Sequence, residues 1–444
     1  MIASSLRDSY DVLIVDANFY NLSPEEFVEK VKEYSPDMVG ISVLTSEYAN
    51  TGHLAAKLVK GIDETITVVL GGVHATIQWG EIEDHNIDFI FTGEGDLAFR
   101  EFVDMLNGKE DSCPSARIAE NPYKIPVIKA EAIQDLNSLP LPSYDIIDYK
   151  DYTVTSPRES VDEPQVYPYG RIMTSRGCPL NCIFCQVNLI MGKGFRKRAV
   201  ENIIKEIDFL VENYKIEYLV FDDDNLFFDK ERAKNLFRLM IQRQYNVGWH
   251  PIATAVYALD EEVLQIARES GLQYVDLAIE SGVERILKNI INKPVNLEHA
   301  KKIVKICRDI GIHTAVNFVI GFPGETWNEI RRTLSFAEEI DADYCKIFIA
   351  NPLTGTRLYE LANKTGSLVH NRTENSWFIG RIQTNEFSPE DLAVLRAYEW
   401  DRINFKTPER REKIAKMMKI TTQRLDEIRK ETLKKTWEIL LSTK

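Results

Sequence analysis

A short β-type run leads into a loop with three cysteines in the stretch Arg171-Ile172-Met173-Thr174-Ser175-Arg176-Gly177-Cys178-Pro179-Leu180-Asn181-Cys182-Ile183-Phe184-Cys185. Cys178, Cys182 and Cys185 are three of the six cysteines in the chain, and the other three are scattered. Three thiolates on one short loop can bind one face of a metal cluster. The stretch therefore indicates a metal site that follows a β-strand.

The β-type run is the first of a series, and helical patterns stand between its members. The runs are Arg171–Ser175, Glu217–Asp222, Trp249–Thr254, Tyr274–Glu280, His313–Ile320 and Tyr344–Ala350. Strands that alternate with helices favour a parallel sheet. This series predicts a partial (β/α)6 barrel of the TIM type over residues 166–365. In such barrels chemistry occurs where the strands end, so the residues just after each run are the candidates for a site.

An earlier series predicts a separate α/β domain over residues 1–106. Its strands are expected at Val12–Ala17, Met38–Val43, Ile66–Leu70 and Asp88–Thr92. These runs are almost continuously apolar, which is typical of parallel strands that are covered on both faces. Residues 107–165 show no clear periodicity and hold several prolines, which predicts a linker. Residues 366–444 are heavily charged and mainly helical in pattern, which predicts a helical C-terminal region.

The composition is that of a globular protein with an acidic balance. The chain has 444 residues, with 68 Asp and Glu against 54 Lys and Arg, so its formal charge is -14. Such a chain is not attracted as a whole to phosphate backbones or anionic lipid, so we expect neither nucleic acid nor a membrane as a partner. No apolar run approaches the roughly 18 residues that a spanning helix needs, and the first residues do not resemble a signal peptide. We therefore expect a cytoplasmic protein.

Zinc, a redox motif and a disulfide are the alternatives for the three cysteines. Structural zinc takes four protein ligands, and no fourth Cys or His lies near this loop. A thioredoxin-like C-x-x-C at Cys182 and Cys185 would leave Cys178 unexplained, and a chain without an export signal is expected in a reducing compartment. A cubane iron–sulfur cluster accepts four ligands. Three cysteines leave one iron open, so a [4Fe-4S] cluster is the favoured interpretation.

The sequence resembles the radical S-adenosylmethionine (radical SAM) enzymes. It shares with them the cysteine spacing C-x3-C-x2-C after the first strand of a partial barrel, with an aromatic residue, here Phe184, just before the last cysteine. The resemblance covers roughly residues 168–360 and implies that the amino and carboxylate groups of S-adenosylmethionine chelate the open iron. It also implies that Phe184 lies over the edge of the adenine. The acidic turn after the second strand resembles the one that holds the methionine amino group, which implicates Asp223 and Asp224. The alternative for Asp222–Asp224 is a helix cap.

Two later segments extend the resemblance. Glu280 and Ser281, at the end of the fourth strand, match the ribose motif, in which a carboxylate accepts hydrogen bonds from both hydroxyls. An unpaired buried charge is costly, so the alternative for Glu280 is a structural ion pair, for example with Arg285. The family's adenine-contacting segment matches the region that contains Asn317, Ile320 and Gly321.

The first domain resembles the cobalamin-binding domains of one branch of this family. Its Ser42 and Leu44 precede Gly71-Gly72 at the spacing of the S-x-L and G-G elements of those domains. Glycines after parallel strands let the backbone approach a ligand in the crevice outside the carboxyl ends. The resemblance implies cobalamin contacts at Ser42, Leu44, Gly71, Gly72, His74, Thr76, Gly93, Glu94 and Gly95. For His74 the alternative is an ordinary loop residue, because it does not occupy the position of the axial histidine of other cobalamin proteins.

The first domain departs from the family at its start. Family members begin with a strand and a loop, whereas Met1–Asp8 resembles the second half of the helix that follows them. The absent strand is central in the flavodoxin-like order 2-1-3-4-5. If Val12–Ala17 and Met38–Val43 keep their family positions, a slot of about 9.6 Å separates them, which is twice the usual strand spacing. We expect either this gap with a weakly folded domain or a longer natural protein, and direct pairing of the two strands would contradict both.

These features predict a cobalamin-dependent radical SAM enzyme. By resemblance, a reduced cluster cleaves S-adenosylmethionine to a 5′-deoxyadenosyl radical, and methylcobalamin then methylates an unactivated carbon of a small-molecule substrate. The implied redox partner is an electron donor such as flavodoxin or ferredoxin. The alternatives are a radical oxidative cyclase, a tRNA methylthiotransferase-like enzyme and a non-catalytic cobalamin or cluster sensor. A methylthiotransferase would bring a second cysteine triad and a basic RNA-binding tail, and neither is visible in the sequence.

Overall fold

The computed structural model describes residues 1–155, 159–163, 166–370 and 379–442. The chain divides into two compact units. Residues 1–149 and 187–196 form the first unit, and residues 150–186 and 197–444 form the second. Among the described residues, no helix is both long and apolar enough to cross a membrane.

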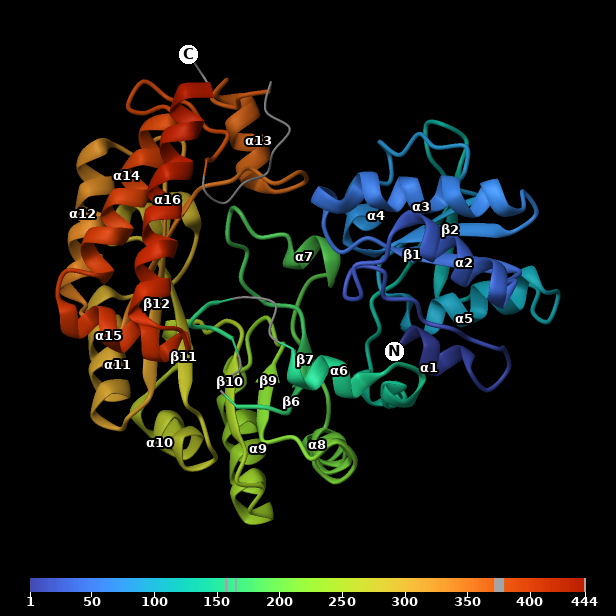
Figure 1. The fold of residues 1–444 in the computed structure, drawn as a ribbon, viewed down its shortest axis with the longest axis horizontal. Helices are drawn as coiled ribbons and strands as arrows, with labels where there is room; N and C mark the ends of the chain where they lie inside the picture. Colours follow the sequence, from blue (N-terminus) through green and yellow to red (C-terminus); the bar gives the residue numbers. More distant parts are fainter. Residues whose placement is uncertain (156–158, 164–165, 371–378, 443–444) are drawn as a thin grey trace. The chain divides into compact units, whose positions relative to one another are not determined.

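A five-stranded sheet forms the centre of the first unit (Figure 1). Its strands are β1 (Met38–Ser42), β2 (Thr67–Gly71), β3 (Phe89–Thr92), β4 (Ala116–Glu120) and β5 (Pro126–Ala130). Their order is β1-β2-β3-β5-β4, and all neighbours are parallel except β4 and β5. The helical elements of this unit are α1 (Ile2–Leu6), α2 (Pro24–Tyr34), η1 (Ser46–Tyr48), α3 (Ala49–Ile62), α4 (Gly72–Gln78), α5 (Gly95–Leu106), η2 (Leu136–Ser138), η3 (Tyr144–Ile146) and α7 (Val187–Ile190).

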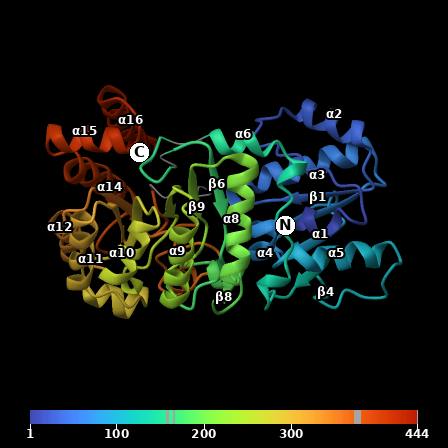
Figure 2. The same cartoon turned by 90° about the horizontal axis from the view of Figure 1, so that it is seen from below.

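Helices cover both faces of this sheet, with α2 and α3 on one side of β1 and with α1 and α5 on the other (Figure 2). Val68 and Leu70 of β2 pack into the core beneath α2 and α3, whereas Val69 packs into the core beneath α1 and α5. Successive side chains of a strand point to opposite faces, so an apolar run with two covered faces is buried throughout. The predicted doubly covered α/β sheet is confirmed.

The predicted strand at Val12–Ala17 is wrong. Residues 11–16 have no regular secondary structure, and Leu13 and Ile14 are 48% and 41% exposed. Among the described residues β1 pairs with β2 alone, so the direct pairing of residues 12–17 with residues 38–43 does not occur either. A strand needs a neighbour for its backbone N–H and C=O groups, and this segment has none beside it in the sheet.

The expectation of an irregular linker is wrong for residues 116–130, because β4 and β5 form a hairpin there and β5 pairs with β3. The hairpin lacked a hydrophobic signal in the sequence. Strand β4 lies at the sheet edge, carries Arg117 and Glu120, and leaves Ile118 59% exposed. An edge strand with little buried surface shows no clear apolar alternation.

The second unit contains the predicted partial barrel. Its strands are β6 (Tyr169–Ile172), β9 (Tyr218–Phe221), β10 (Gly248–Pro251), β11 (Tyr274–Glu280), β12 (His313–Ile320) and β13 (Tyr344–Ile349). The parallel sheets β6-β9-β10 and β11-β12-β13 are joined by the bridges from Trp249 to Leu272 and from Thr254 to Leu277. The strands therefore form one parallel arc in chain order.

Helices surround the outside of this arc, from α8 to α12 (Figure 2). The remaining elements of the unit are α6 (Tyr149–Val154), β7 (Ser175–Arg176), β8 (Arg196–Lys197), α8 (Val200–Tyr214), α9 (Lys230–Arg243), η4 (Val256–Ala258), α10 (Glu261–Glu269), the π-helix η5 (Ile286–Ile291), α11 (Leu297–Asp309), α12 (Trp327–Glu339), α13 (Arg357–Lys364), α14 (Pro389–Asn404), α15 (Pro408–Met417) and α16 (Thr422–Ser442). The boundary segments α6 and β8 include residues of the first unit.

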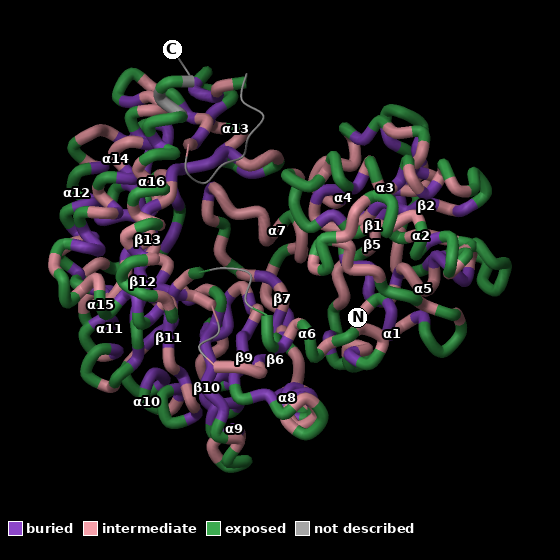
Figure 3. Tube along the Cα trace, in the orientation of Figure 1, coloured by how far each residue is buried: buried purple, intermediate pink, exposed green. Residues whose placement is uncertain are grey.

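Burial differs among the barrel strands. Strands β9 and β10 are buried throughout (Figure 3), whereas along β13 partly exposed residues alternate with buried ones. Successive side chains of a strand point to opposite faces, and helices cover the outer face of this sheet. The half-buried alternate residues therefore face the interior, and these include Lys346 and Phe348 of β13 and Asn317 and Val319 of β12.

The C-terminal region is helical, as predicted, and its helix α14 covers the free edge of the barrel. Among the described residues β13 pairs with β12 alone. On its other edge, the side chain of Asn404 in α14 accepts a hydrogen bond from the N–H of Cys345 at 2.7 Å and donates to the same residue's carbonyl at 2.8 Å. Arg396 donates to the carbonyl of Ile347 at 3.1 Å. Helix α14 thus satisfies backbone groups that an exposed edge would leave open.

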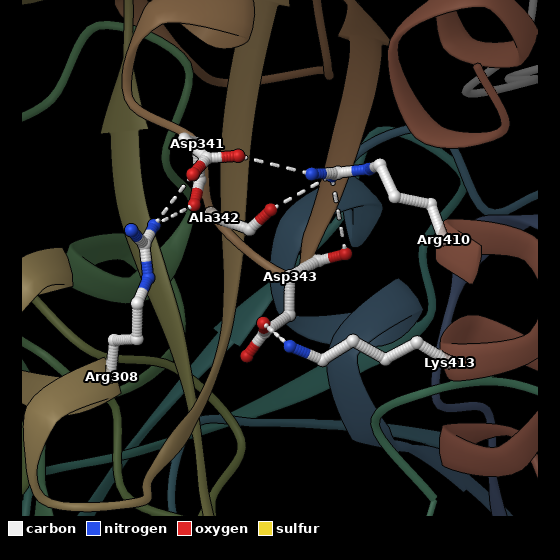
Figure 4. Close-up of a pocket in the computed structure, with 6 residues that line it drawn as sticks. All are labelled: Arg308, Asp341, Ala342, Asp343, Arg410 and Lys413. Atoms are coloured by element: carbon white, nitrogen blue, oxygen red, sulfur yellow. Dashed lines mark hydrogen bonds and ion pairs between the residues drawn. The ribbon is translucent and has the colours of Figure 1, made fainter. Parts of the chain in front are cut away.

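A polar pocket at the start of β13 lies away from the strand ends that carry the predicted site (Figure 4). Asp341 pairs with Arg308 at 3.0 Å and with Arg410 at 3.1 Å, and Asp343 pairs with Lys413. The pairs with Arg410 and Lys413 join α15 to the barrel. The pocket is therefore part of the packing of the C-terminal helices, because each of its charged side chains is already in an ion pair.

Candidate active site

The three cysteines lie on the loop that follows β6 and β7, as predicted. Cys178, Cys182 and Cys185 are half-buried and form no disulfide bond, whereas the remaining cysteines are buried. Among the described residues no three His, Cys, Asp or Glu side chains come close enough to hold a single metal ion.

The cysteine loop is attached to two other parts of the unit. The N–H of Ile183 donates to the carbonyl of Ile291 at 2.9 Å, and the carbonyl of Ile183 accepts from Leu358 at 2.8 Å. Asn292 donates through its side chain to the carbonyl of Asn181 at 3.2 Å. The loop segment between Cys178 and Cys185 is therefore supported by the end of the π-helix and by the start of α13.

The acidic turn after β9 supports the same loop. Asp223 is fully buried, and its carboxylate accepts from the N–H and hydroxyl of Thr174, at 3.1 and 2.6 Å, and from the hydroxyl of Ser175. Asp224 accepts from the N–H of Gly177 at 2.9 Å. These hydrogen bonds assign Asp223 to the support of the loop rather than to a cofactor. The helix-cap alternative is wrong, because Asp229 is the residue that caps α9.

Asn225 continues this turn toward the cysteines, and nothing in the sequence singled it out. Its amide nitrogen lies 3.7 Å from the sulfur of Cys178 and donates to the hydroxyl of Tyr257 at 2.9 Å. Burial raises the pKa of Tyr257, and Cys178 and Cys182 are among the charges that raise it further. Tyr257 and Asn225 therefore border the cysteines, although they are far from them in the sequence.

Glu280 ends β11 in an unusual conformation. The register of β11 against β12 shifts between Ala278 and Glu280, and Glu280 has a φ of 74°. A bulge of this kind redirects a side chain, and a positive φ is uncommon outside glycine. The carboxylate is buried and pairs with Lys293 at 2.6 Å. The predicted alternative of a structural ion pair agrees with this contact, but the partner is Lys293 and not Arg285, which pairs with Glu329.

Lys293 is a functional candidate that the sequence did not reveal. It follows Asn292, which ends the π-helix in a left-handed conformation. Burial lowers its pKa, but the carboxylate of Glu280 and the thiol of Cys182 outweigh burial, so the pKa is raised. Burial raises the pKa of Cys182 to about 12, and Lys293 opposes that effect. The buried pair thus lies within electrostatic reach of the cysteines.

The remaining predicted contacts of S-adenosylmethionine lie near the ends of β11 and β12. Ser281 is fully buried, and its hydroxyl bonds to that of Thr333 at 3.1 Å, which assigns it to packing against α12. Ile320 is also fully buried, so only its backbone is available to a ligand. Gly321 has a φ of +91°, and a Cβ there would lie 2.3 Å from Leu392.

The segment after β12 meets the cysteine loop through aromatic rings. The rings of Phe184 and Phe322 have centroids 6.1 Å apart. Glu325 accepts hydrogen bonds from the N–H groups of Gly321 and Phe322 at 2.7 and 3.0 Å. These contacts shape the turn, and burial raises the pKa of Glu325 to about 7.

Several buried polar atoms in this unit have no hydrogen-bond partner, and they lie on or just after successive strands. They are Oδ1 of Asn225, Oγ1 of Thr254, Oδ1 of Asn317, Oε1 of Glu325 and both polar side-chain atoms of Asn351. An unsatisfied buried group costs about 1–3 kcal/mol. Acceptors and donors of this kind match the amino, hydroxyl and purine groups of S-adenosylmethionine. The residues at the strand ends therefore fit such a ligand.

In the first unit, the glycine turns after β2 and β3 lie side by side. The hydroxyl of Thr76 donates to the carbonyl of Gly72 at 2.9 Å and accepts from the N–H of Gly93 at 3.0 Å. Gly72 has a φ of +89°, and a Cβ there would lie 2.6 Å from the carbonyl oxygen of Val43. Ser42 and Leu44 are exposed beside these turns. The missing side chain at Gly72 thus lets the turn after β2 pack closely against the backbone that follows β1.

His74 and Glu94 differ in their freedom to bind a ligand. Nδ1 of His74 lies 3.2 Å from the hydroxyl of Ser46, whereas its buried Nε2 has no partner. Burial, and next the nearby His53, lower the pKa of His74. Glu94 is held by Arg196 at 2.6 and 2.8 Å and accepts from the N–H of Ile133 at 2.8 Å, which assigns it to a structural ion pair. Gly95 packs close to Ile2.

Comparison with known proteins agrees with both units. The Radical SAM superfamily matches residues 172–337, and the B12 binding domain matches residues 1–103. An uncharacterized methyltransferase of Pyrococcus horikoshii is 34% identical over 365 residues, which cover 81% of this chain and 77% of that protein. Cytidylyl-2-hydroxyethylphosphonate methyltransferase of Streptomyces wedmorensis is 30% identical over 376 residues, which cover 76% of this chain and 69% of that protein.

A solved structure shows the same fold. The cobalamin-dependent S-adenosylmethionine radical enzyme OxsB, with aqua-cobalamin and S-adenosylmethionine bound, superposes with a TM-score of 0.71 over 97% of this chain and 68% of its own, at 15% identity. The chain therefore belongs to the radical SAM enzymes that carry a B12-binding domain.

Proposed function

We propose that this chain is a cobalamin-dependent radical SAM methyltransferase and that Cys178, Cys182 and Cys185 hold its [4Fe-4S] cluster. The observation that carries the proposal is the loop itself, with three half-buried cysteines at the strand ends of a partial barrel, beside buried polar atoms without partners. Each thiolate of a cubane binds a different iron, so these sulfurs need not converge on a single ion. When bound, the cluster and S-adenosylmethionine supply a carbon radical, and cobalamin supplies a methyl group.

The residues around the loop have distinct proposed roles. Glu280 would accept hydrogen bonds from the ribose hydroxyls, and its bulge and positive φ aim its carboxylate for that purpose. Phe184 would pack on the adenine, with Asn317 and the backbone of Ile320 and Gly321 beside it. Asp224 would act indirectly, because its hydrogen bond to Gly177 positions the start of the loop.

In the first unit, cobalamin would bind at the carboxyl ends of β1, β2 and β3. Ser42, Leu44 and the turn at Gly71 and Gly72 would approach it, and His74 would offer the buried Nε2 of its ring. Thr76, Gly93 and Gly95 would keep the two turns in place. A low-potential one-electron donor such as flavodoxin or ferredoxin would reduce the cluster.

The substrate is proposed to be a small polar molecule. The interior of the barrel carries Asn317 and Lys346, and Lys346 donates to Asp276 at 2.6 Å. Oδ1 of Asp276 is buried without a partner. A site of this polarity favours a compact group that forms hydrogen bonds over an extended apolar one.

The test is anaerobic reconstitution with iron, sulfide, cobalamin and S-adenosylmethionine, followed by reduction with dithionite and mass spectrometry. A methyltransferase should form both 5′-deoxyadenosine and S-adenosylhomocysteine, the second from renewal of methylcobalamin. A cyclase would form 5′-deoxyadenosine alone, and a sensor would form neither. Cys182→Ala should abolish the cluster absorbance and both products, whereas Cys307→Ala, at a buried cysteine on α11, should keep them. An intact cluster in Cys182→Ala would refute the assignment.

A further inference from the structure

We propose that Lys293 holds a buried positive charge beside the cluster loop and thereby makes the cluster easier to reduce. The inference rests on the proposed assignment of the three cysteines. It concerns a positioning and electrostatic role, because Lys293 acts on the cluster through its charge.

The backbone around Lys293 is attached to the cysteine loop on both sides of Cys182. The carbonyl of Ile291 accepts from the N–H of Ile183 at 2.9 Å, and the side chain of Asn292 donates to the carbonyl of Asn181 at 3.2 Å. The N–H of Lys293 itself donates to the carbonyl of Leu287 at 2.9 Å, which closes the turn after the π-helix. These bonds fix the position of Lys293 relative to Cys182.

The side chain of Lys293 cannot move its charge into water. It is 7% exposed, and its ammonium group lies 2.6 Å from Oε1 of Glu280. An ion pair of this kind keeps a buried lysine charged, because separation of the partners would leave an uncompensated charge. The backbone bonds on both sides of Cys182 place this buried pair beside the cysteine loop.

The charge of the cluster decides the direction of the effect. A [4Fe-4S]2+ cluster with three thiolates carries a net charge of about -1, and one electron from a low-potential donor takes it to about -2. A fixed cation stabilises the more negative state more, and the low dielectric of a buried site strengthens the interaction. Removal of the cation should therefore lower the reduction potential, and removal of the counter-charge on Glu280 should raise it.

The structure offers matched variants for the test. Lys293→Met removes the charge, and Lys293→Arg retains it. Lys288→Met is the control, because Lys288 lies on the same π-helix, is 66% exposed, and pairs with Glu284 at 2.9 Å. Glu280→Gln leaves the ammonium of Lys293 uncompensated and tests whether the reduction potential then rises. Each protein is reconstituted without S-adenosylmethionine, and its iron and sulfide content is measured before dithionite titration monitored by electron paramagnetic resonance.

We expect Lys293→Met to reduce the equilibrium constant for reduction about tenfold, which corresponds to a potential about 59 mV lower for one electron. In Lys293→Arg and Lys288→Met the equilibrium constant for reduction should stay within about twofold of that of the native protein. In Glu280→Gln the reduction potential should be higher than in the native protein. A Lys293→Met variant that holds a full cluster and keeps the native reduction potential overturns the inference. A lysine with a purely structural role would change only how much cluster the protein holds. If that variant loads no cluster, an unshifted or lowered potential in Glu280→Gln overturns it. Failure of the native protein to form a cluster would instead overturn the proposed function.

Discussion

Replacement of Arg196 by Met should destabilise the first unit by about 3–5 kcal/mol, which is the usual cost when one partner of a buried ion pair is removed. Arg196 and Glu94 have side chains that are only 9% and 5% exposed, and their two bonds measure 2.6 and 2.8 Å. Arg196 also donates to the carbonyls of Ile133 and Met191. The variant would leave the carboxylate of Glu94 buried without its cation.

A double-mutant cycle separates the energy of the ion pair from the energy that is lost with the packing of Arg196. Glu94→Gln together with Arg196→Met removes both charges, while the glutamine oxygen can still accept from the N–H of Ile133. We expect the double variant to recover at least about 2 kcal/mol relative to Arg196→Met, because contacting residues couple by up to roughly 3 kcal/mol. The measurement is urea unfolding with pulsed hydrogen exchange on peptides from β3, α5 and residues 187–196.

The control for this prediction is Arg117→Met in the same unit. Arg117 and Glu131 form an ion pair at 3.1 Å, but their side chains are 83% and 60% exposed. Such a surface pair contributes about 0–1 kcal/mol. The reasoning is refuted if Arg196→Met loses no more stability than Arg117→Met, or if the double variant recovers nothing.

Two further predictions concern a glycine and a buried acid. Gly72→Ala should destabilise the first unit by about 2–4 kcal/mol, because the positive φ and the clash with the backbone of Val43 each add a cost. The control is Gly61→Ala on α3, which has open space around it and should be neutral or slightly stabilising. Equal unfolding midpoints of the two variants in urea would contradict this prediction. Glu325 has a folded-state pKa of about 7 against an ordinary value of 4.5, so its contribution to stability is full below about pH 4.5 and is lost as the pH rises through about 7. The loss is roughly 3 kcal/mol. Glu325→Gln should flatten this part of the profile in thermal unfolding, and an unchanged slope would exclude the effect.

The barrel was predictable because its signals are local. Apolar runs buried on the outer face of a sheet, and helices with one apolar face, leave a clear pattern in the sequence. Each of the strands β11, β12 and β13 was accordingly expected within one residue of its observed end. The cysteine spacing was equally readable, because the residues that share a cluster lie on one short loop.

The sequence predicts less well the roles of residues that depend on a partner far away in the chain. For Glu280, Arg285 was the partner named in the ion-pair alternative to the ribose role, but a π-helix and a left-handed Asn292 bring Lys293 to it instead. Asp223 and Glu94 lie within motifs that the resemblance assigned to cofactors, yet their carboxylates are occupied by Thr174 and Arg196. A motif defines residue types and spacing, but it does not show which hydrogen bonds are already made.

The sequence by itself determined the α/β character of both units, the order of the barrel strands and the position of the cysteine loop, because periodicity, glycine turns and cysteine spacing are properties of neighbouring residues. The tertiary structure alone decided that residues 12–17 form no strand and that residues 116–130 extend the sheet. It also decided that Lys293 lies beside the cysteines. Strand pairing and buried ion pairs join residues that are far apart in the chain, so their energies depend on which backbone edges and charges the fold brings together.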